Sequence, residues 1–222
     1  MAQKLININA FSLPESWITL IRTILNNGRD FVIDSGSYAG HIRKELDFVT
    51  VHIEKPSHSP IVPTSAMLPQ NCKFPPPCDI DYIDNEYVPR YLMSDTKTKN
   101  ETYTYGTRMM EQWSNIIKMY KEGGHRTNQA CIEIAMPSDI MLSDPPCLRL
   151  IDTRIQDNKL HFYIYFRSWD AWSGFPANMA GLQRIKEIMA YEIGIEDGEL
   201  IACSKGLHLY DIYFEVAQQL KV

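Results

Sequence analysis

Two neighbouring stretches, 148–155 and 159–168, constrain the fold most strongly, because both alternate as β-strands and only Gln156-Asp157-Asn158 separates them. The second stretch carries large side chains on both of its faces. One face holds Leu160, Phe162, Ile164 and Phe166, and the other holds His161, Tyr163, Tyr165 and Arg167. Aromatic side chains on both faces predict burial on both faces. We therefore expect a sheet stacked on a second sheet, which another subunit is able to supply.

Helical and strand periodicities alternate along the rest of the chain without strict βαβ order, which predicts the α+β class. Ser12 to Glu15 reads as a capping box, and glycines close the helices that follow. A turn is expected at 34–37. The expected helices are 13–27, the segment between Tyr105-Gly106 and Gly123-Gly124, 178–193, and an amphipathic helix from 209 onward. The further expected strands are 31–34, 45–54, 130–135 and 200–204.

Prolines crowd the segment 55–77, which predicts a long irregular loop packed over the domain and not a linker between domains. The chain has 222 residues, of which 45% are hydrophobic. That size and composition predict a single domain, 1–222, with a substantial core.

The formal net charge of −5 argues against general attraction to nucleic acid, so no DNA partner is expected. No signal peptide and no run of membrane-spanning length is recognisable, which predicts a cytoplasmic protein without a membrane partner. The five cysteines are irregularly spaced and form no CxxC motif. Reduced thiols and no metal site are the expectation.

Four short motifs in the C-terminal half carry the chemistry. Cys147 follows Pro145-Pro146, and a cysteine becomes a nucleophile when nearby positive charge lowers its pKa. The alternative is a buried cysteine that packs as a small hydrophobe. Arg167-Ser168 offers a guanidinium and a hydroxyl, which suit a phosphate. An internal carboxylate such as Asp152 is the alternative partner for Arg167.

The other two motifs supply an amide and a histidine–tyrosine pair. Asn178 offers a donor and an acceptor, which match the adjacent O4 and N3–H of a uracil ring. The alternative is that Asn178 caps the helix that it precedes. If the backbone at His208-Leu209-Tyr210 is extended, His208 and Tyr210 point the same way and both are able to donate to a sugar hydroxyl. Local satisfaction of both side chains is the alternative.

Taken in order, these motifs resemble the thymidylate synthase family, whose pattern is Pro-Cys, Arg-Ser-x-Asp, Gly-x-Pro-x-Asn and His-x-Tyr. The resemblance covers roughly the C-terminal half, from Tyr105-Gly106 onward. The short length and the local sequences around Cys147 and His208 are most similar to the compact archaeal branch. The matching segments here are Pro146-Cys147, Arg167-Ser168-Trp169-Asp170, Gly174-Phe175-Pro176-Ala177-Asn178 and His208-Leu209-Tyr210.

The resemblance implies a mixed sheet covered by helices on one face and stacked on the equivalent sheet of a second subunit. It implies methylation of dUMP to dTMP, with Cys147 attacking C6 and Asn178 selecting uracil. Arg167 and Ser168 would bind the phosphate, and Arg167 would also favour the Cys147 thiolate. Asp170 would help hold both pyrimidine and pterin, and His208 and Tyr210 would contact the 3′-hydroxyl.

The co-substrate implied by the resemblance is 5,10-methylenetetrahydrofolate or 5,10-methylenetetrahydromethanopterin. Arg126 is the candidate for an arginine that crosses to the phosphate site of the other subunit in a homodimer. Glu86 is the candidate for a proton-relaying glutamate, and Arg43 for a mobile phosphate-binding arginine. The sequence departs from the family at Phe166, where a glutamine is usual, and at Leu148, where a histidine is usual.

Two other functions are compatible with these residues. A pyrimidine-nucleotide hydroxymethylase of the same superfamily would share Cys147 and the phosphate site, but water would capture its intermediate. Asn178 favours uracil over cytosine in either enzyme. A non-catalytic nucleotide- or RNA-binding relative would keep the phosphate site and lose turnover, and the presence of Cys147 argues against it.

Overall fold

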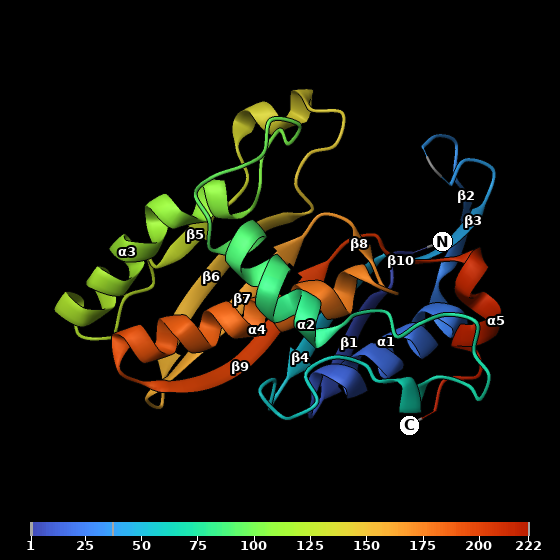
Figure 1. Cartoon of the computed structure of the whole chain (residues 1–222), viewed down its shortest axis with the longest axis horizontal. Coiled ribbons are helices and arrows are strands. Elements are labelled where there is room, and N and C mark those ends of the chain that lie inside the picture. The colour runs from blue at the N-terminus through green and yellow to red at the C-terminus, as the bar shows by residue number, and fades with distance from the viewer. Residues whose placement is uncertain (1, 37, 222) are drawn as a thin grey trace.

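The computed structural model describes residues 2–36 and 38–221, which form two mixed sheets and the helices around them (Figure 1). The six-stranded sheet has the order β1-β4-β9-β7-β6-β5, and the four-stranded sheet has the order β2-β3-β10-β8. The large sheet contains β1 (Leu5–Ala10), β4 (Phe48–Ile53), β9 (Glu196–Ser204), β7 (Lys159–Phe166), β6 (Leu148–Gln156) and β5 (Cys131–Glu133). The small sheet contains β2 (Arg29–Val32), β3 (Ile42–Leu46), β10 (Leu207–Tyr210) and β8 (Trp169–Asp170). The expected α+β class is confirmed.

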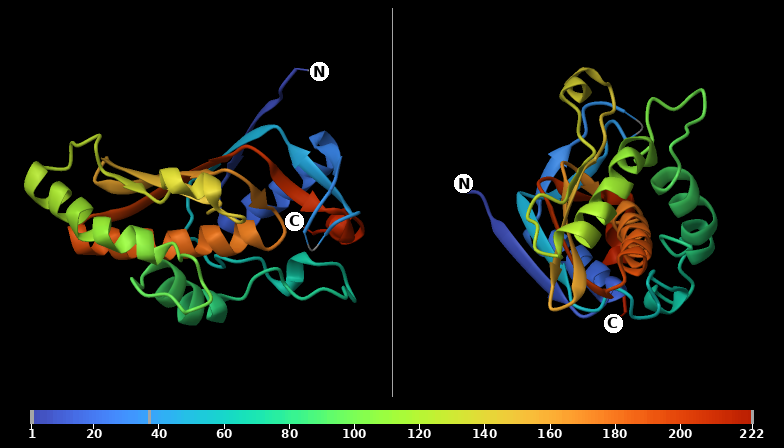
Figure 2. Two further views of the ribbon diagram at one scale, coloured as in Figure 1. Left: turned by 90° about the horizontal axis from the view of Figure 1, so that it is seen from above. Right: turned by 90° about the vertical axis from the view of Figure 1, so that its left-hand side faces the viewer.

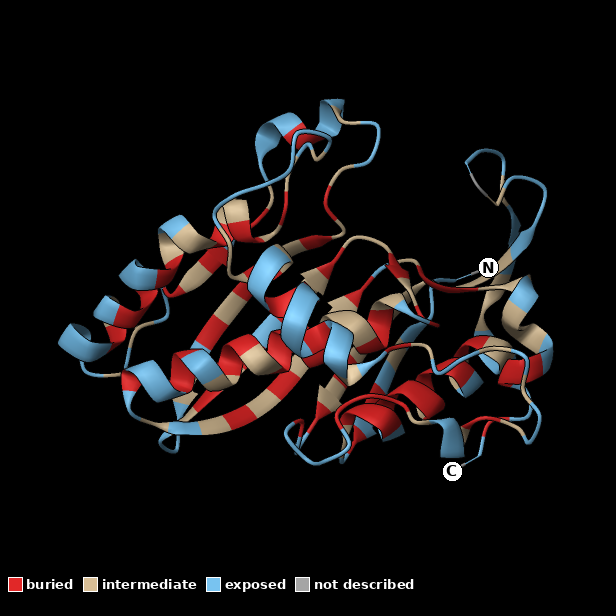
Figure 3. Ribbon diagram, viewed as in Figure 1, coloured by how far each residue is buried: buried red, intermediate tan, exposed pale blue. Residues whose placement is uncertain are grey.

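Three long helices lie on one side of the large sheet, as the two further views show (Figure 2). They are α1 (Leu13–Asn27), α3 (Gly106–Gly123) and α4 (Gly174–Ile193). Their buried sides face the sheet (Figure 3). A second helical layer, α2 (Ile80–Tyr82) with η2 (Ile83–Leu92), contacts α4. The short helices are η1 (Ser65–Met67), η3 (Pro137–Met141), η4 (Asp211–Tyr213) and α5 (Phe214–Ala217).

The β6–β7 hairpin forms where the sequence predicts it. Asp157 and Asn158 have φ angles of 52° and 59°, as a tight two-residue hairpin turn requires. The inward side chains Leu160, Phe162, Ile164 and Phe166 are at most 2% exposed, whereas Tyr163 on the outer face is 37% exposed. The helices of the described residues 2–36 and 38–221 thus leave the outer face of the large sheet uncovered (Figure 2).

Helix ends follow the expected capping chemistry. The Ser12 hydroxyl accepts from the Glu15 N–H at 3.4 Å, and the Glu15 carboxylate accepts from the Phe11 N–H at 2.9 Å. Gly124 and Gly194 follow α3 and α4 with φ angles of 76° and 91°, a conformation that glycine adopts without strain.

Two expected elements are wrong. The stretch 45–54 is divided between β3 and β4, which lie in different sheets, and the break falls at Asp47, whose carboxylate binds Arg29. The amphipathic helix expected from 209 onward is instead β10 followed by short helical turns. Pairing of β10 with both β3 and β8 outweighs the helical periodicity of that segment.

Other segments differ more modestly from expectation. Helix α4 begins at Gly174, four residues before Asn178. Strand β1 and the π-helical turn η2 had no clear pattern in the sequence. The segment 55–77 is irregular apart from η1, and its Ile61, Val62 and Leu68 are buried in the core. The turn expected at 34–37 includes Ser37, which lies outside the described residues.

Candidate active site

Backbone pairing brings three separate segments together at one end of the sheets. The Arg167 N–H donates to the Cys147 carbonyl at 2.8 Å, which ties the end of β7 to the loop before β6. Strand β8 runs parallel to β10, so that Asp170 is opposite His208. The Ala171 N–H then donates to the His208 carbonyl at 2.8 Å. Ser168 is half-buried in the bend between β7 and β8. These contacts gather most of the site residues predicted from the sequence.

The Arg167 guanidinium holds the loop that carries Cys147. Its Nε donates to the Pro146 carbonyl at 3.1 Å, and its Nη2 donates to the Pro145 carbonyl. The Asp144 carboxylate lies 3.6 Å from Nη2, so Asp144 and not Asp152 is the acidic partner of Arg167. Because Asp144 is 91% exposed, this ion pair is screened by solvent. Arg167 therefore sits between the loop of Cys147 and the solvent.

The Cys147 thiol is subject to opposing electrostatic effects. Burial raises its pKa, Arg167 opposes that rise, Asp144 adds to it, and Arg149 opposes it again. The net direction is upward. The sequence led us to expect that Arg167 favours the thiolate, and its effect has that sign, but burial outweighs it. The thiol is therefore mostly protonated at neutral pH in the free protein.

We expect alkylation of Cys147 by iodoacetamide to accelerate about tenfold between pH 7 and pH 8, because only the thiolate reacts. Asp144→Asn should raise the rate at pH 8 by about two- to threefold, since it removes an exposed negative charge beside the thiol. Peptide mass mapping separates Cys147 from the other cysteines. Asp157→Asn, at the far end of β6, is the matched control. A rate that is unchanged or lower in Asp144→Asn contradicts this electrostatic assignment.

A buried ion-pair network supports the same loop from behind. Asp139 of η3 is 2% exposed and accepts from Arg108 of α3 at 2.7 and 2.8 Å and from Arg149 of β6 at 3.1 Å. Arg149 also donates to the Pro146 carbonyl at 3.3 Å. Hydrogen bonds from Arg108 lower the pKa of Asp139 to about 2. The network thus fixes the peptide unit that joins Pro146 to Cys147.

Asn178 lies inside α4, so the alternative that it caps this helix is wrong. The helix start is held instead by Asp170, whose carboxylate accepts from the backbone N–H groups of Trp172, Ser173 and Gly174 at 2.9–3.1 Å. The Asn178 side chain is half-buried and accepts from Trp169 Nε1 at 2.9 Å. Its Nδ2 donates to the Tyr87 hydroxyl at 2.6 Å. Any ligand contact of Asp170 or Asn178 is additional to these bonds.

The backbone at His208 and Tyr210 is extended, and their side chains share a hydrogen bond. His208 Nδ1 lies 2.9 Å from the Gly206 carbonyl, so Nδ1 carries the proton and Nε2 accepts from the Tyr210 hydroxyl at 3.1 Å. Burial lowers the pKa of His208, which keeps the ring neutral. Tyr210 also stacks on Tyr38 at 4.2 Å. In this arrangement the pair presents the phenolic oxygen as an acceptor, and not two free donors.

The remaining predicted residues lie at different distances from this centre. Arg43 is opposite Tyr210 in β3 and forms an ion pair with Glu45 at 3.0 Å. Glu86 is exposed on η2, and its neighbour Tyr87 is the residue that contacts Asn178. Arg126 follows the end of α3, which lies at the far left of Figure 1, away from β8 and β10. There it lines a cavity of about 490 Å³ with Arg154.

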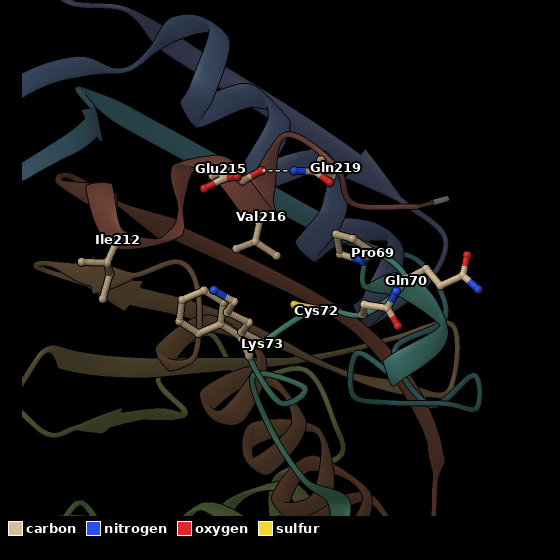
Figure 4. Close-up of a pocket in the computed structure, with 10 residues that line it drawn as sticks. Pro69, Gln70, Cys72, Lys73, Ile212, Glu215, Val216 and Gln219 are labelled. Atoms are coloured by element: carbon tan, nitrogen blue, oxygen red, sulfur yellow. Dashed lines mark hydrogen bonds between the residues drawn. The ribbon is translucent and has the colours of Figure 1, made fainter.

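A further cavity of about 240 Å³ lies between the segment 69–74 and the C-terminal residues 212–219 (Figure 4). The Cys72 sulfur points into it, and Lys73 and Glu215 supply its charged groups. It shares no lining residue with the predicted site. Phe74, which lines this cavity, packs its ring against the rings of Trp172 and Tyr213.

Within residues 2–36 and 38–221, no group of three His, Cys, Asp or Glu side chains is arranged to hold a metal ion. Over the same residues, no helix is long and apolar enough to cross a membrane.

Sequence reasoning missed Tyr87, Trp169 and the Asp139 network. Trp169 stands inside the Arg-Ser-x-Asp motif, at the position that the motif leaves free. Tyr87 is 91 residues from Asn178, and only its aromatic neighbours Tyr82 and Tyr91 marked the segment. Arg149, two residues after Cys147, was a signal of the Asp139 network that the sequence offered. A charged residue at the start of a largely buried strand needs a partner.

Comparison with known proteins agrees with these features. The family model described as thymidylate synthase matches residues 84–221. Proteins from Methanosarcina mazei and Methanosarcina acetivorans are each 26% identical to this chain over 96% of it and 93% of their own length. One from Methanothermobacter thermautotrophicus is 23% identical over 96% of this chain and 97% of its own. All three carry the name "Putative thymidylate synthase".

The two mixed sheets, with long helices on one side of the larger sheet, define an α+β protein. The chain belongs to the thymidylate synthase family. The resemblance to that family, including its archaeal members, is confirmed.

Proposed function

We propose that this protein is a thymidylate synthase that converts dUMP to dTMP through a covalent bond between Cys147 and C6 of the uracil ring. The observation that carries the proposal is the contact of the Arg167 guanidinium with the Pro145 and Pro146 carbonyls directly before Cys147. This contact ties the proposed phosphate-binding group to the loop that carries the proposed nucleophile. Family membership supports the same conclusion.

The residues of the chain have the following roles in the proposed reaction. Cys147 loses its proton and its thiolate forms a bond to C6, which makes C5 nucleophilic. The methylene-tetrahydropterin supplies the one-carbon unit and the hydride. After C5 has bonded to the methylene carbon and lost its proton, the bond between that carbon and the pterin nitrogen breaks and releases the tetrahydropterin. The released tetrahydropterin then transfers a hydride to the methylene carbon and becomes a dihydropterin, while the C6–S bond breaks and restores the thiolate. Cys147 is therefore unchanged over one cycle.

In the proposed complex, the nucleotide contacts the segment that carries Arg167, Ser168 and Asp170, the strand that carries His208 and Tyr210, and helix α4. Arg167 and Ser168 bind the phosphate, and Arg43 adds charge from β3. The phenolic oxygen of Tyr210, aligned by His208, accepts from the 3′-hydroxyl. Asn178 reads the uracil edge from α4. Asp170, at the start of that helix, contributes to both the pyrimidine site and the pterin site.

A homodimer completes the proposal. The outer face of the large sheet carries partly exposed apolar and aromatic side chains, such as Tyr163, and no helix of the described chain covers it. Stacking of this face on its equivalent in a second subunit would bury these side chains. Arg126, which follows the end of α3, is the proposed arginine that serves the phosphate site of the other subunit.

Arg167→Ala should weaken dUMP binding about tenfold to 100-fold, because a charge-assisted hydrogen bond to the phosphate is lost. The affinity for uncharged deoxyuridine should fall much less. A loosened Cys147 loop would weaken both ligands equally, so the difference between their losses reports the phosphate contact alone. Isothermal titration calorimetry measures both dissociation constants. Arg184→Ala, which removes a half-buried arginine paired with Asp84, is the control. Equal losses for dUMP and deoxyuridine would refute a phosphate contact of Arg167.

The proposed function is tested by release of tritium from C5-labelled dUMP. The assay is run with methylenetetrahydrofolate and with methylenetetrahydromethanopterin, and the products are separated by chromatography. Tritium release with dTMP as product is the expected result. Hydroxymethyl-dUMP as product would instead identify a hydroxymethylase, and no release with either pterin would exclude both enzymes.

A further inference from the structure

The Asn178 amide is held between two partners that differ in whether they are able to accept a hydrogen bond. Trp169 Nε1–H donates to Oδ1 at 2.9 Å, and Nδ2 donates to the Tyr87 hydroxyl at 2.6 Å. An indole N–H is a donor only, whereas a hydroxyl donates or accepts. Rotation of the amide by 180° would place its NH₂ group against the Trp169 N–H, with two donors facing each other. Trp169 therefore fixes the orientation of the amide, and Tyr87 adapts to it.

The Trp169 ring is held so that it cannot turn away from Asn178. It is 2% exposed and stacks on Phe166 with ring centroids 3.9 Å apart and an angle of 11°. Phe175 of α4 lies against it at 4.8 Å. Its backbone is paired with Leu207 between β8 and β10. The indole N–H is thus a rigid feature of the site.

Tyr87 is positioned by the absence of a side chain on α4. A Cβ at Gly181 would lie 2.6 Å from two carbon atoms of the Tyr87 ring, so only glycine allows this approach. Burial raises the pKa of Tyr87 well above its ordinary value, which keeps its hydroxyl protonated. The hydroxyl consequently remains able to donate or to accept.

The orientation of this amide matters because uracil and cytosine present opposite patterns. Uracil offers an acceptor at O4 and a donor at N3, whereas cytosine offers a donor at N4 and an acceptor at N3. After its two internal bonds, the Asn178 amide retains one N–H and one lone pair, which match uracil in one orientation and cytosine in the other. A freely rotating amide would serve both bases.

We propose that Trp169 is a specificity-determining positioning residue, which fixes the Asn178 amide in one orientation and thereby sets the preference for uracil over cytosine nucleotides. The inference rests on the proposed function and adds to it the residue that sets base selection. Phe166, where the family usually has glutamine, belongs to the same unit, because it provides the surface on which Trp169 stacks.

The test compares Trp169→Phe with the wild-type protein in binding to dUMP and dCMP. Phenylalanine keeps an aromatic ring on Phe166 but has no N–H. The ratio of the two dissociation constants should fall about tenfold in favour of dCMP, because one hydrogen bond no longer opposes rotation of the amide. Tyr87→Phe removes the other partner of the amide and should change this ratio less than twofold. A ratio unchanged in Trp169→Phe overturns the proposal.

A double-mutant cycle makes the test specific for orientation. A carboxylate has two equivalent oxygens, so in Asn178→Asp there is no orientation to fix, and the preference shifts toward dCMP. Adding Trp169→Phe to that variant should leave the dUMP/dCMP ratio unchanged. A similar change in both backgrounds would mean that Trp169 acts only through packing, and would overturn the proposal.

A measurement without nucleotide separates this proposal from the proposed function. The indole proton of Trp169, assigned by its loss in Trp169→Phe, should exchange slowly with solvent in the wild-type protein and at least tenfold faster in Asn178→Ala. An unchanged exchange rate overturns the positioning role. If exchange responds as expected but neither nucleotide binds to the wild-type protein, the failure lies in the proposed function, and the specificity proposal falls with it.

Discussion

Cys147→Ser is expected to lower the rate of dTMP formation by a factor on the order of 10⁴ or more, since a nucleophile that acts in concert with its surroundings cannot be replaced by a much weaker one. Binding of dUMP should change less than about threefold, because the serine hydroxyl is similar in size and the groups that hold the phosphate and base are intact. Steady-state kinetics and calorimetry measure the two quantities.

The matched control is Cys203→Ser on β9. Cys203 is also a half-buried thiol whose pKa is raised by burial. It differs from Cys147 in that it lies on the outer face of the large sheet, opposite Tyr165, and its thiol donates to the Ile164 carbonyl at 3.5 Å. It should retain its rate of turnover. Unchanged turnover in Cys147→Ser would reject covalent catalysis by this residue.

Asp139→Asn is expected to reduce the free energy of unfolding at pH 7 by about 3 kcal/mol, because a buried carboxylate is removed while Arg108 and Arg149 keep their charges. The loop before Cys147 should loosen at the same time, since Arg149 also binds the Pro146 carbonyl. Urea unfolding followed by circular dichroism measures the stability. Glu122→Gln, in an exposed pair with Lys118, should cost less than about 0.5 kcal/mol.

The effect of Asp139→Asn should depend on pH with a definite sign. The pKa of Asp139 is about 2 in the folded protein, below its ordinary value of 3.8. Its contribution to stability is therefore complete above about pH 4 and is lost as the pH falls toward 2. The stability difference between wild type and variant should shrink over that range. A difference that stays constant from pH 7 to pH 2 would show that Asp139 does not act through its charge.

The sequence predicted those parts of the fold that depend on local pattern. The β6–β7 hairpin, the start of α1 at Ser12 and the glycine-terminated helices α3 and α4 follow from periodicity and capping, and they are confirmed. The C-terminal segment failed because its helical pattern is weaker than the pairing of β10 with two neighbouring strands. The secondary structure of such a segment is determined by strands that are distant in the sequence, and a local pattern holds no information about them.

The candidate site was predictable to the same extent. The motif residues Cys147, Arg167, Asp170 and His208 meet through backbone pairing of the segments that carry them, and their roles in the reaction stay predictions. The upward shift in the pKa of Cys147 was not predictable, because burial depends on the whole fold. Nor were the bonds that fix the Asn178 amide, since Tyr87 comes from a helix without a recognisable motif.

The central claim is that the Cys147 sulfur bonds to C6 of a bound uracil ring, and intact-protein mass spectrometry with 5-fluoro-dUMP and the methylene-tetrahydropterin tests it most directly. Fluorine at C5 does not leave as a proton does, so the covalent intermediate should accumulate. The predicted result is a mass increase equal to nucleotide plus pterin, located on the peptide that contains Cys147 and absent from Cys147→Ser. No adduct, or an adduct on another residue, would contradict the account.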